Sequence, residues 1–315
     1  MTQYLLRRLL MLVPILLALS FLIFLMMALV PGDPAQAILG PYASAENLSK
    51  LRSELDLDRP WPERYVRWLG GVLQGDFGTS YSLDRPVIDE IRDRAGATAL
   101  LAGSAFLLCA LFGVAAGVVS AVYQDRWPDR LIGLTVLVGI STPSFWLGLV
   151  LIVIFAVGLQ WFPASGMYSV IGSNGLSDLL AHLTLPAITL AMVAAGVVAR
   201  LMRTNMLETL RLDYVRTARA KGMTEPHVIN RHALRNAIVG MIPVLGVQAG
   251  FVIGGAVYVE SVFQWPGLGR MLVTAIQSRD ILLVQGSVLI LATAYVLFNL
   301  LADLLQHWLD PRIKT

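Results

Sequence analysis

The residues whose types and spacing could bind a partner are concentrated in Asp213–Ala237, the longest dense block of cationic side chains in the chain. Small and apolar residues alternate there with cations at helical spacing, and Gly222 follows where a helix would stop. Pro226 then suits the first turn of a second helix, where a missing backbone N–H costs nothing. The block predicts a helix, a glycine bend and another helix. It indicates either a docking surface or a basic loop that only fixes membrane orientation.

Other chemistry is sparse in the chain. His227 and His232 are five residues apart, which does not place them on one face of an α-helix, and no acidic residue is spaced to complete a metal site. None of the three lysines follows a glycine, so the G-x-x-x-x-G-K-[ST] loop that cradles nucleotide phosphates is missing. We therefore predict that the chain binds no metal and no ATP. Its one cysteine, Cys109, lies in an apolar run and cannot form a disulfide framework.

The elements that must position these residues are membrane spans. Charged residues make up 14% of the 315 residues and the mean hydropathy is +0.68, whereas a soluble domain carries about 25% charge. We predict an all-α, polytopic membrane protein with six transmembrane helices, at Leu9–Val30, Ala95–Tyr123, Leu131–Gly158, Leu183–Ala199, Ile238–Val259 and Ile281–Ala302. The first run is longer than the apolar part of a signal peptide and is interpreted as a retained anchor.

Positive charge is distributed unequally between the two sides of this arrangement. The loops on the side of the N-terminus hold most of the arginines and lysines, and the two short opposite loops hold only Arg270 and Arg279. This predicts that both termini and the central loop are cytoplasmic and that residues 31–95 are external. The predicted parts are an anchor span at 1–30, an external region at 31–95, a five-span core at 96–306 containing a cytoplasmic loop at 204–237, and a cytoplasmic tail at 307–315.

The spans themselves carry no central charge. An ion-coupled carrier usually has a charged residue at its coupling site, so an ion-coupled carrier is disfavoured and a pore worked by external energy is favoured. The candidate lining of that pore is neutral and polar, apart from one acid expected near the cytoplasmic mouth: Ser141, Thr142, Gln248, Asn299 and Asp303. Glycines at four-residue spacing in the fifth span would let another helix approach closely.

Two segments carry a family resemblance. YVRTARAKG followed by HALRNA, and VFQWPGLGR after the fifth span, resemble the integral membrane permeases of bacterial ABC importers, in the dipeptide, oligopeptide, glutathione and nickel branch. The loop signature of that family corresponds here to Arg216, Thr217, Ala218 and then Gly222. The first position of the signature is usually acidic in the family, but it is Arg216 in this chain. Later positions that are usually hydrophobic and proline are His232 and Arg235 here.

The resemblance implies a type I ABC importer permease fold in a bacterial cytoplasmic (inner) membrane. It implies that the central loop docks on an ATPase subunit through Arg216, Thr217, Ala218, Arg219, Lys221, Gly222, His232, Arg235 and Asn236. The second segment is expected to form an external gate or binding-protein contact through Trp265, Gly267 and Arg270.

The partners implied are a second homologous permease, two ABC ATPase subunits that bind ATP and Mg²⁺, an external substrate-binding protein and the lipid bilayer. No nucleic acid is expected. The ligand implied is a dipeptide, oligopeptide or glutathione, with nickel or a metal chelate as the alternative. A channel or ion-coupled carrier is the competing class, which would transport without ATP.

Overall fold

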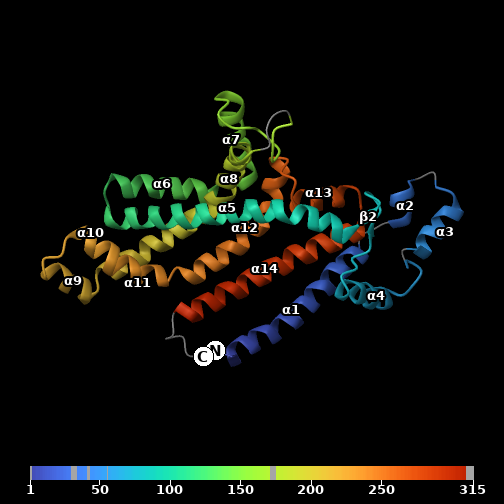
Figure 1. The fold of residues 1–315 in the computed structure, drawn as a ribbon, viewed down its shortest axis with the longest axis horizontal. Coiled ribbons are helices and arrows are strands. Elements are labelled where there is room, and N and C mark those ends of the chain that lie inside the picture. The colour runs from blue at the N-terminus through green and yellow to red at the C-terminus, as the bar shows by residue number, and fades with distance from the viewer. Residues whose placement is uncertain (1, 30–33, 41–42, 55, 171–174, 310–315) are drawn as a thin grey trace. The chain divides into compact units, whose positions relative to one another are not determined.

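The computed structural model describes residues 2–29, 34–40, 43–54, 56–170 and 175–309, and these are almost entirely helical (Figure 1). They form two compact units. Unit 1 comprises Met1–Thr98 and Pro266–Ala294, and unit 2 comprises Ala99–Trp265 and Tyr295–Thr315. Unit 1 takes in Pro266–Ala294, which lies within the predicted core at 96–306. The units are defined by packing, so the predicted parts of the chain stay predictions.

Unit 1 combines the first long helix with the short helices of the polar region. Its elements are α1 (Thr2–Ala28), α2 (Pro34–Leu39), α3 (Ala45–Glu54), α4 (Trp61–Leu73), β1 (Thr79–Ser80), β2 (Arg85–Pro86), α13 (Leu268–Gln277), the first part of α5 (Val87–Val122) and the first part of α14 (Ile281–Leu309). The two strands are antiparallel. Ser44 accepts a hydrogen bond at its Oγ from the Asn47 N–H at 3.2 Å, which caps α3.

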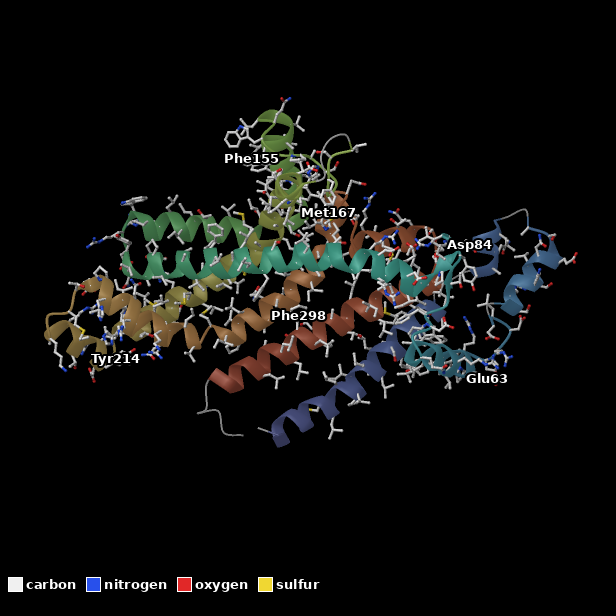
Figure 2. The ribbon with its side chains drawn as sticks, viewed as in Figure 1. Glu63, Asp84, Phe155, Met167, Tyr214 and Phe298 are labelled. Carbon is white, nitrogen blue, oxygen red and sulfur yellow. The ribbon has the colours of Figure 1, made fainter. Side chains whose placement is uncertain are left out.

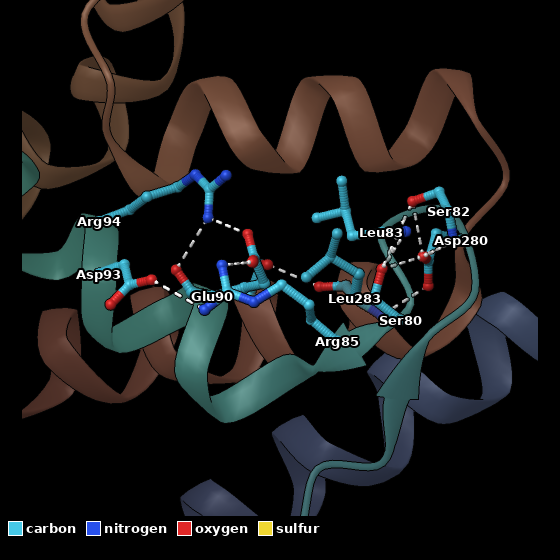
Figure 3. A network of polar contacts seen from close by, with 10 residues as sticks. Ser80, Ser82, Leu83, Arg85, Glu90, Asp93, Arg94, Asp280 and Leu283 are labelled. Carbon is cyan, nitrogen blue, oxygen red and sulfur yellow. Dashed lines mark hydrogen bonds and ion pairs between the residues drawn. The ribbon is translucent and has the colours of Figure 1, made fainter.

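The core of unit 1 joins segments that are far apart in the sequence. Buried residues of α5, α13 and α14, including Val87, Met271 and Leu283, pack together with Phe77. Beside them lies the Asp280 network, which we define as Ser80, Ser82, Leu83, Asp280 and Leu283 (Figure 3). Packing and polar contacts together therefore attach the β1–β2 hairpin to the start of α14.

Unit 2 is built around the long helix α8. Its elements are the rest of α5, α6 (Trp127–Ser141), α7 (Ser144–Leu151), the π-helix η1 (Ile152–Gly158), α8 (Leu176–Leu210), α9 (Asp213–Ala220), α10 (Glu225–His227), the π-helix η2 (Val228–Ala233), α11 (Leu234–Val239), α12 (Ile242–Val262) and the end of α14. A Cβ atom at Gly113 or Gly117 would lie under 3.0 Å from Val198 or Met202 of α8. Glycine therefore permits the close approach of α5 to α8.

Five helices of the described residues are long and apolar enough to cross a membrane, and a sixth span is possible where two helices meet at a bend. The five correspond to predicted spans one, two, four, five and six, although α5 and α8 extend well beyond the predicted limits. The third predicted span differs, because α6 and α7 with η1 meet at an angle of 111°. Pro143, which has no N–H to continue the helix, lies at this break.

An ion pair fixes the start of α6 against α8. Arg203 donates from Nε and Nη2 to the two carboxylate oxygens of Asp129, at 2.8 and 2.7 Å. Ser120 also donates to Asp129, and the backbone N–H of Asp125 does so at 2.9 Å. Asp129 is therefore buried with both oxygens satisfied, as a buried charge requires.

The glycines of the fifth predicted span divide into two groups. A Cβ at Gly246 would lie 2.2 Å from the Ala302 Cβ, and one at Gly250 would lie 2.4 Å from the Tyr295 ring. These two glycines therefore permit close packing of α12 on the end of α14. A Cβ at Gly254 would meet nothing within 4 Å, so this position is open within the chain.

Candidate functional site

The central loop, defined here as residues 211–240, is the candidate site. It contains α9, which is the predicted first helix, and the bend that follows it. The predicted second helix is divided into α10, η2 and α11. Tyr214, labelled in Figure 2, lies on α9 among the side chains of this loop. The bend follows α9 directly, and Lys221 and Gly222 donate backbone N–H groups to Thr217 and Arg219 at 3.0 and 2.9 Å.

One face of the loop is apolar and buried. Val215 and Ala218 of α9 pack against Val228 of η2, and Leu210 at the end of α8 covers the same cluster. Val215 and Val228 are fully buried. Helix α9 is amphipathic, because its buried residues Val215 and Ala218 are three positions apart and share one face. Burial of this face attaches α9 to the end of α8.

Polar side chains connect α9 to the rest of the loop. The Asn236 Nδ2 donates to the Tyr214 hydroxyl at 2.7 Å, and that hydroxyl donates to the His232 carbonyl at 3.3 Å. Arg219 and Glu225 form an ion pair across the bend at 2.7 Å. These contacts join α9 to α10, η2 and α11.

The opposite face of α9 is exposed and cationic. The side chain of Arg216 is 70% exposed and lies 3.7 Å from Asp213, which is itself 98% exposed. Thr217, Lys221, Arg231 and Arg235 are also exposed. A surface pair of this kind contributes little to stability. The cations on this face are therefore available to a partner.

Gly222 occupies a conformation that favours glycine. Its φ is +78°, in the left-handed region, and a Cβ placed there would meet nothing within 4 Å. A side chain at this position would cost backbone strain and would project into open space. The bend therefore presents bare backbone at the surface beside Lys221.

The two histidines of the loop correct one step of the sequence argument. Residues five apart do not share an α-helical face, but η2 is a π-helix, whose bonds run from residue i to i+5. The rings of His227 and His232 consequently lie with centroids 5.9 Å apart. No group of three His, Cys, Asp or Glu side chains in the described part of the chain could hold a metal ion. The absence of a metal site in this protein remains a prediction.

The predicted pore residues lie on several elements. Ser141 and Thr142 lie at the break between α6 and α7, Gln248 is buried on α12, and Asn299 bonds to the Tyr295 carbonyl of its own helix at 3.0 Å. No hydrogen bond connects any two of these four among the described residues. The side chain of Asp303 lies outside the described residues. The structure therefore shows no hydrogen-bonded group of these residues in the described chain, and pore lining stays a prediction.

The predicted external contact segment is more buried than expected. Trp265 is fully buried and Gly267 is buried at the start of α13. The predicted role of the segment as an external gate or binding-protein contact stays a prediction. An indole ring is large and apolar, and packing inside the unit takes precedence over exposure. Arg270, half-buried, lines a cavity of about 290 Å³ in unit 1 together with Arg94 and Ser82.

Sequence reasoning missed three of the contacts that hold the site. Tyr214 was assigned only to a helix, and its link to Asn236 spans 22 residues. Glu225 pairs with Arg219 across the bend, a contact that the sequence analysis did not predict. An acidic residue just beyond a glycine bend in a cationic helix is a signal that could have indicated this pair. The Asp129–Arg203 pair spans 74 residues and has no local signal.

Comparison with known proteins supplies the family. Residues 113–315 match the model described as "Binding-protein-dependent transport system inner membrane component", and residues 1–102 match the model for the N-terminal part of such membrane components. The chain is 43% identical over 315 residues to the glutathione transport system permease protein GsiC of Salmonella paratyphi A, covering 100% of this chain and 99% of that protein. It is 40% identical over 314 residues to GsiC of Escherichia coli K12, with the same coverage.

Solved structures support the same fold. The MetNI methionine ABC transporter in inward-facing conformations aligns with TM-scores of 0.56 and 0.58, at 16% and 15% identity, over 70% of this chain and 96% of that chain. The helical fold and these matches define the class, a multi-pass permease subunit of an ABC importer. The chain belongs to the family of binding-protein-dependent transport system inner membrane components.

Proposed function

We propose that this chain is the permease subunit of an ATP-driven importer that takes up glutathione or a short peptide delivered by an external binding protein. The observation that carries the proposal is the 40–43% identity to glutathione permeases over the whole chain. A second homologous permease completes the pore. ATP and Mg²⁺ are bound by two partner ATPase subunits, because this chain has no phosphate-binding loop.

In this proposal the central loop couples the ATPases to the pore. The exposed cationic face of α9 and the bare backbone at Gly222 dock on an ATPase subunit in the cytoplasm. The buried cluster of Val215, Ala218 and Val228 transmits movement to α8, and the Tyr214–Asn236 contact transmits it to α11. Closure of the ATPases on ATP then switches the pore from inward-facing to outward-facing.

Selectivity in this proposal belongs mainly to the binding protein. The spans offer a charged peptide only backbone groups and neutral side chains such as Gln248 and Asn299, with no charge at the centre of a span. Exchange of the binding protein for a compatible relative should therefore change the ligand that is transported. Ligand binding tight enough to survive purification, and lost on replacing Gln248 or Asn299, would place selectivity in the membrane instead.

The test is uptake by vesicles that contain the permease with its partner subunits and binding protein. Radiolabelled glutathione and the dipeptide Ala-Ala are supplied outside, with ATP and Mg²⁺ inside. We expect uptake that requires both ATP and the binding protein. Uptake driven by an ion gradient without ATP would instead identify a carrier.

A further inference from the structure

Unit 1 contains a cavity of about 400 Å³ whose lining combines opposite charges. Pockets for small ligands usually measure about 300–1,000 Å³, so this volume suits a small molecule. The lining comes from α1, the turn at 56–57, α4, the segment at 76–81 and the start of α14. Its charged members are two arginines and two aspartates, Arg64, Arg67, Asp56 and Asp76.

Gln285 of α14 is the residue that points to a missing ligand. Its side chain lines this cavity and only 3% of the residue is exposed, yet its carboxamide forms no hydrogen bond with any residue that the structure describes. Trp68 of α4 lines the same cavity, and its Nε1 is buried and also without a partner there. Buried polar groups are normally hydrogen-bonded, because an unmade bond is expensive. A ligand in the cavity would supply an acceptor for such donors.

Arg64 has unused donors as well. Its guanidinium lies 5.9 Å from the centre of the Phe24 ring, and no carboxylate among the described side chains pairs with it. Burial lowers the pKa of Arg64, although the charge of Asp56 acts in the opposite direction. Arg67 differs, because it already lies 3.5 Å from Asp56. Arg64 is therefore the cation of the cavity that can receive an anionic group.

Asp76 has spare capacity of the opposite kind. Its Oδ1 accepts the Gly78 N–H at 2.8 Å, and its second oxygen forms no bond within the described chain. A carboxylate can accept from several donors, so an ammonium group could bind at that oxygen. The cavity thus offers separate positions for a negative and a positive group of one molecule.

We propose that this cavity binds a small zwitterion weakly, with its carboxylate on Arg64 and Gln285 and its ammonium group at Asp76. Peptides and glutathione are zwitterions of this kind. The role of the site in holding cargo before transport therefore rests on the proposed function. A zwitterionic phospholipid headgroup shares this chemistry, and the experiment below distinguishes the two sources.

Binding is tested on the full permease in its complex, in phosphatidylcholine nanodiscs without ATP or binding protein. Saturation-transfer NMR measures the Kd for Ala-Ala, for glutathione and for N-acetyl-alanyl-alanine amide, which has neither charge. We expect weak, saturable binding of the first two only. Arg64→Met and Gln285→Leu should each raise the Kd by about tenfold, since each removes a hydrogen bond to a charged group. Arg92→Met and Gln277→Leu, at exposed positions outside the cavity lining, are matched controls.

A second readout separates this role from a structural one. Gln285→Leu removes an unpaired buried group, so it should raise the unfolding temperature of the ligand-free protein while weakening binding. Equal Kd values in the variants and controls, or equal binding of the uncharged peptide, would overturn the proposal. The proposal would also be overturned if Ala-Ala did not bind and phospholipid copurified with the wild type but not with the variants. Loss of cavity binding in the variants, with no ATP-driven uptake by the wild type, would support the site and overturn the proposed function.

Discussion

The central loop of unit 2 and the Asp280 network of unit 1 are both rich in polar side chains, but they use them in opposite ways. In the loop, Arg216 is 70% exposed and its contact with Asp213, at 3.7 Å, is a surface pair. In the network, Asp280 is 1% exposed and accepts four hydrogen bonds. Their donors are the Ser80 and Ser82 hydroxyls and the Ser82 and Leu283 N–H groups, at 2.6 to 3.1 Å (Figure 3).

The two regions differ in whether their charged groups already have all their hydrogen bonds within the chain. A buried charge whose bonds are all made within the chain holds the fold, and its removal leaves donors unpaired. An exposed cation with few internal bonds contributes little to stability and can bind another molecule. Substitutions in the loop should therefore reduce transport while preserving the fold, and substitutions in the network should reduce stability first.

Gly222→Glu should have the largest effect, loss of uptake to background. The backbone strain at φ +78° costs about 1 kcal/mol, which the fold can tolerate, and the new side chain projects from the proposed docking surface without a clash in the chain. Uptake and the amount of inserted permease are measured separately. ATPase copurification shows whether docking is lost.

Gly75→Glu is the matched control for this prediction. Gly75 has a φ of +84° and likewise has nothing within 4 Å of a Cβ, but it lies in unit 1, after α4. It carries the same backbone cost without the proposed docking surface, so uptake should continue. Normal uptake by well-expressed Gly222→Glu would reject the coupling role of the loop.

Asp280→Ala should have the next largest effect, a loss of about 3 kcal/mol in the free energy of unfolding. The substitution leaves the hydroxyls of Ser80 and Ser82 and the N–H of Leu283 without their acceptor in a buried place. Denaturant or thermal unfolding of the purified permease measures the change. Asp89→Ala removes a half-exposed acid 3.6 Å from Arg92 and should cost under about 1 kcal/mol. Similar losses for both variants would remove the distinction drawn between buried and surface acids.

The sequence predicted the elements that depend on local pattern. Long apolar runs predicted five of the helices, and Gly222 predicted the bend. The family assignment was also confirmed. These features depend on composition or on residues a few positions apart, so a single sequence contains them.

Features that depend on contacts between distant residues could not be predicted. The Asp280 network joins residues about 200 positions apart, and the assignment of Pro266–Ala294 to unit 1 is of the same kind. The break at Pro143 lies inside the third predicted span, and sequence alone does not say whether neighbouring groups restore the helix there. The π-helix that brings His227 beside His232 has no sequence period that distinguishes it from an α-helix.

Tyr214→Phe should have a smaller effect, on coupling rather than on folding. The substitution removes the hydroxyl that joins Asn236 to α9 and keeps the ring, at a cost of about 1 kcal/mol. Because α9 remains attached to α8 through Val215, we expect uptake per ATP hydrolysed to fall a few-fold rather than vanish. Simultaneous assays of ATP hydrolysis and uptake give this ratio. An unchanged ratio would show that the α11 contact takes no part in transmission.

Single cysteines at Ser44 and Thr224 should have the smallest effect on transport. They test whether the polar region at 31–95 and the central loop face opposite sides of the membrane. Both positions are exposed, and the native Cys109 is buried and can be replaced in the background. Ser82 is less suitable, because its hydroxyl bonds to Asp280 at 2.8 Å. The excess of arginine and lysine beside the central loop predicts that this loop is cytoplasmic. A thiol reagent that cannot cross the membrane should therefore label the cysteine at residue 44 in intact cells, and that at residue 224 only after the cells are opened. Labelling of residue 224 alone in intact cells would reverse the orientation, and the cationic face of α9 could not then dock on a cytoplasmic ATPase.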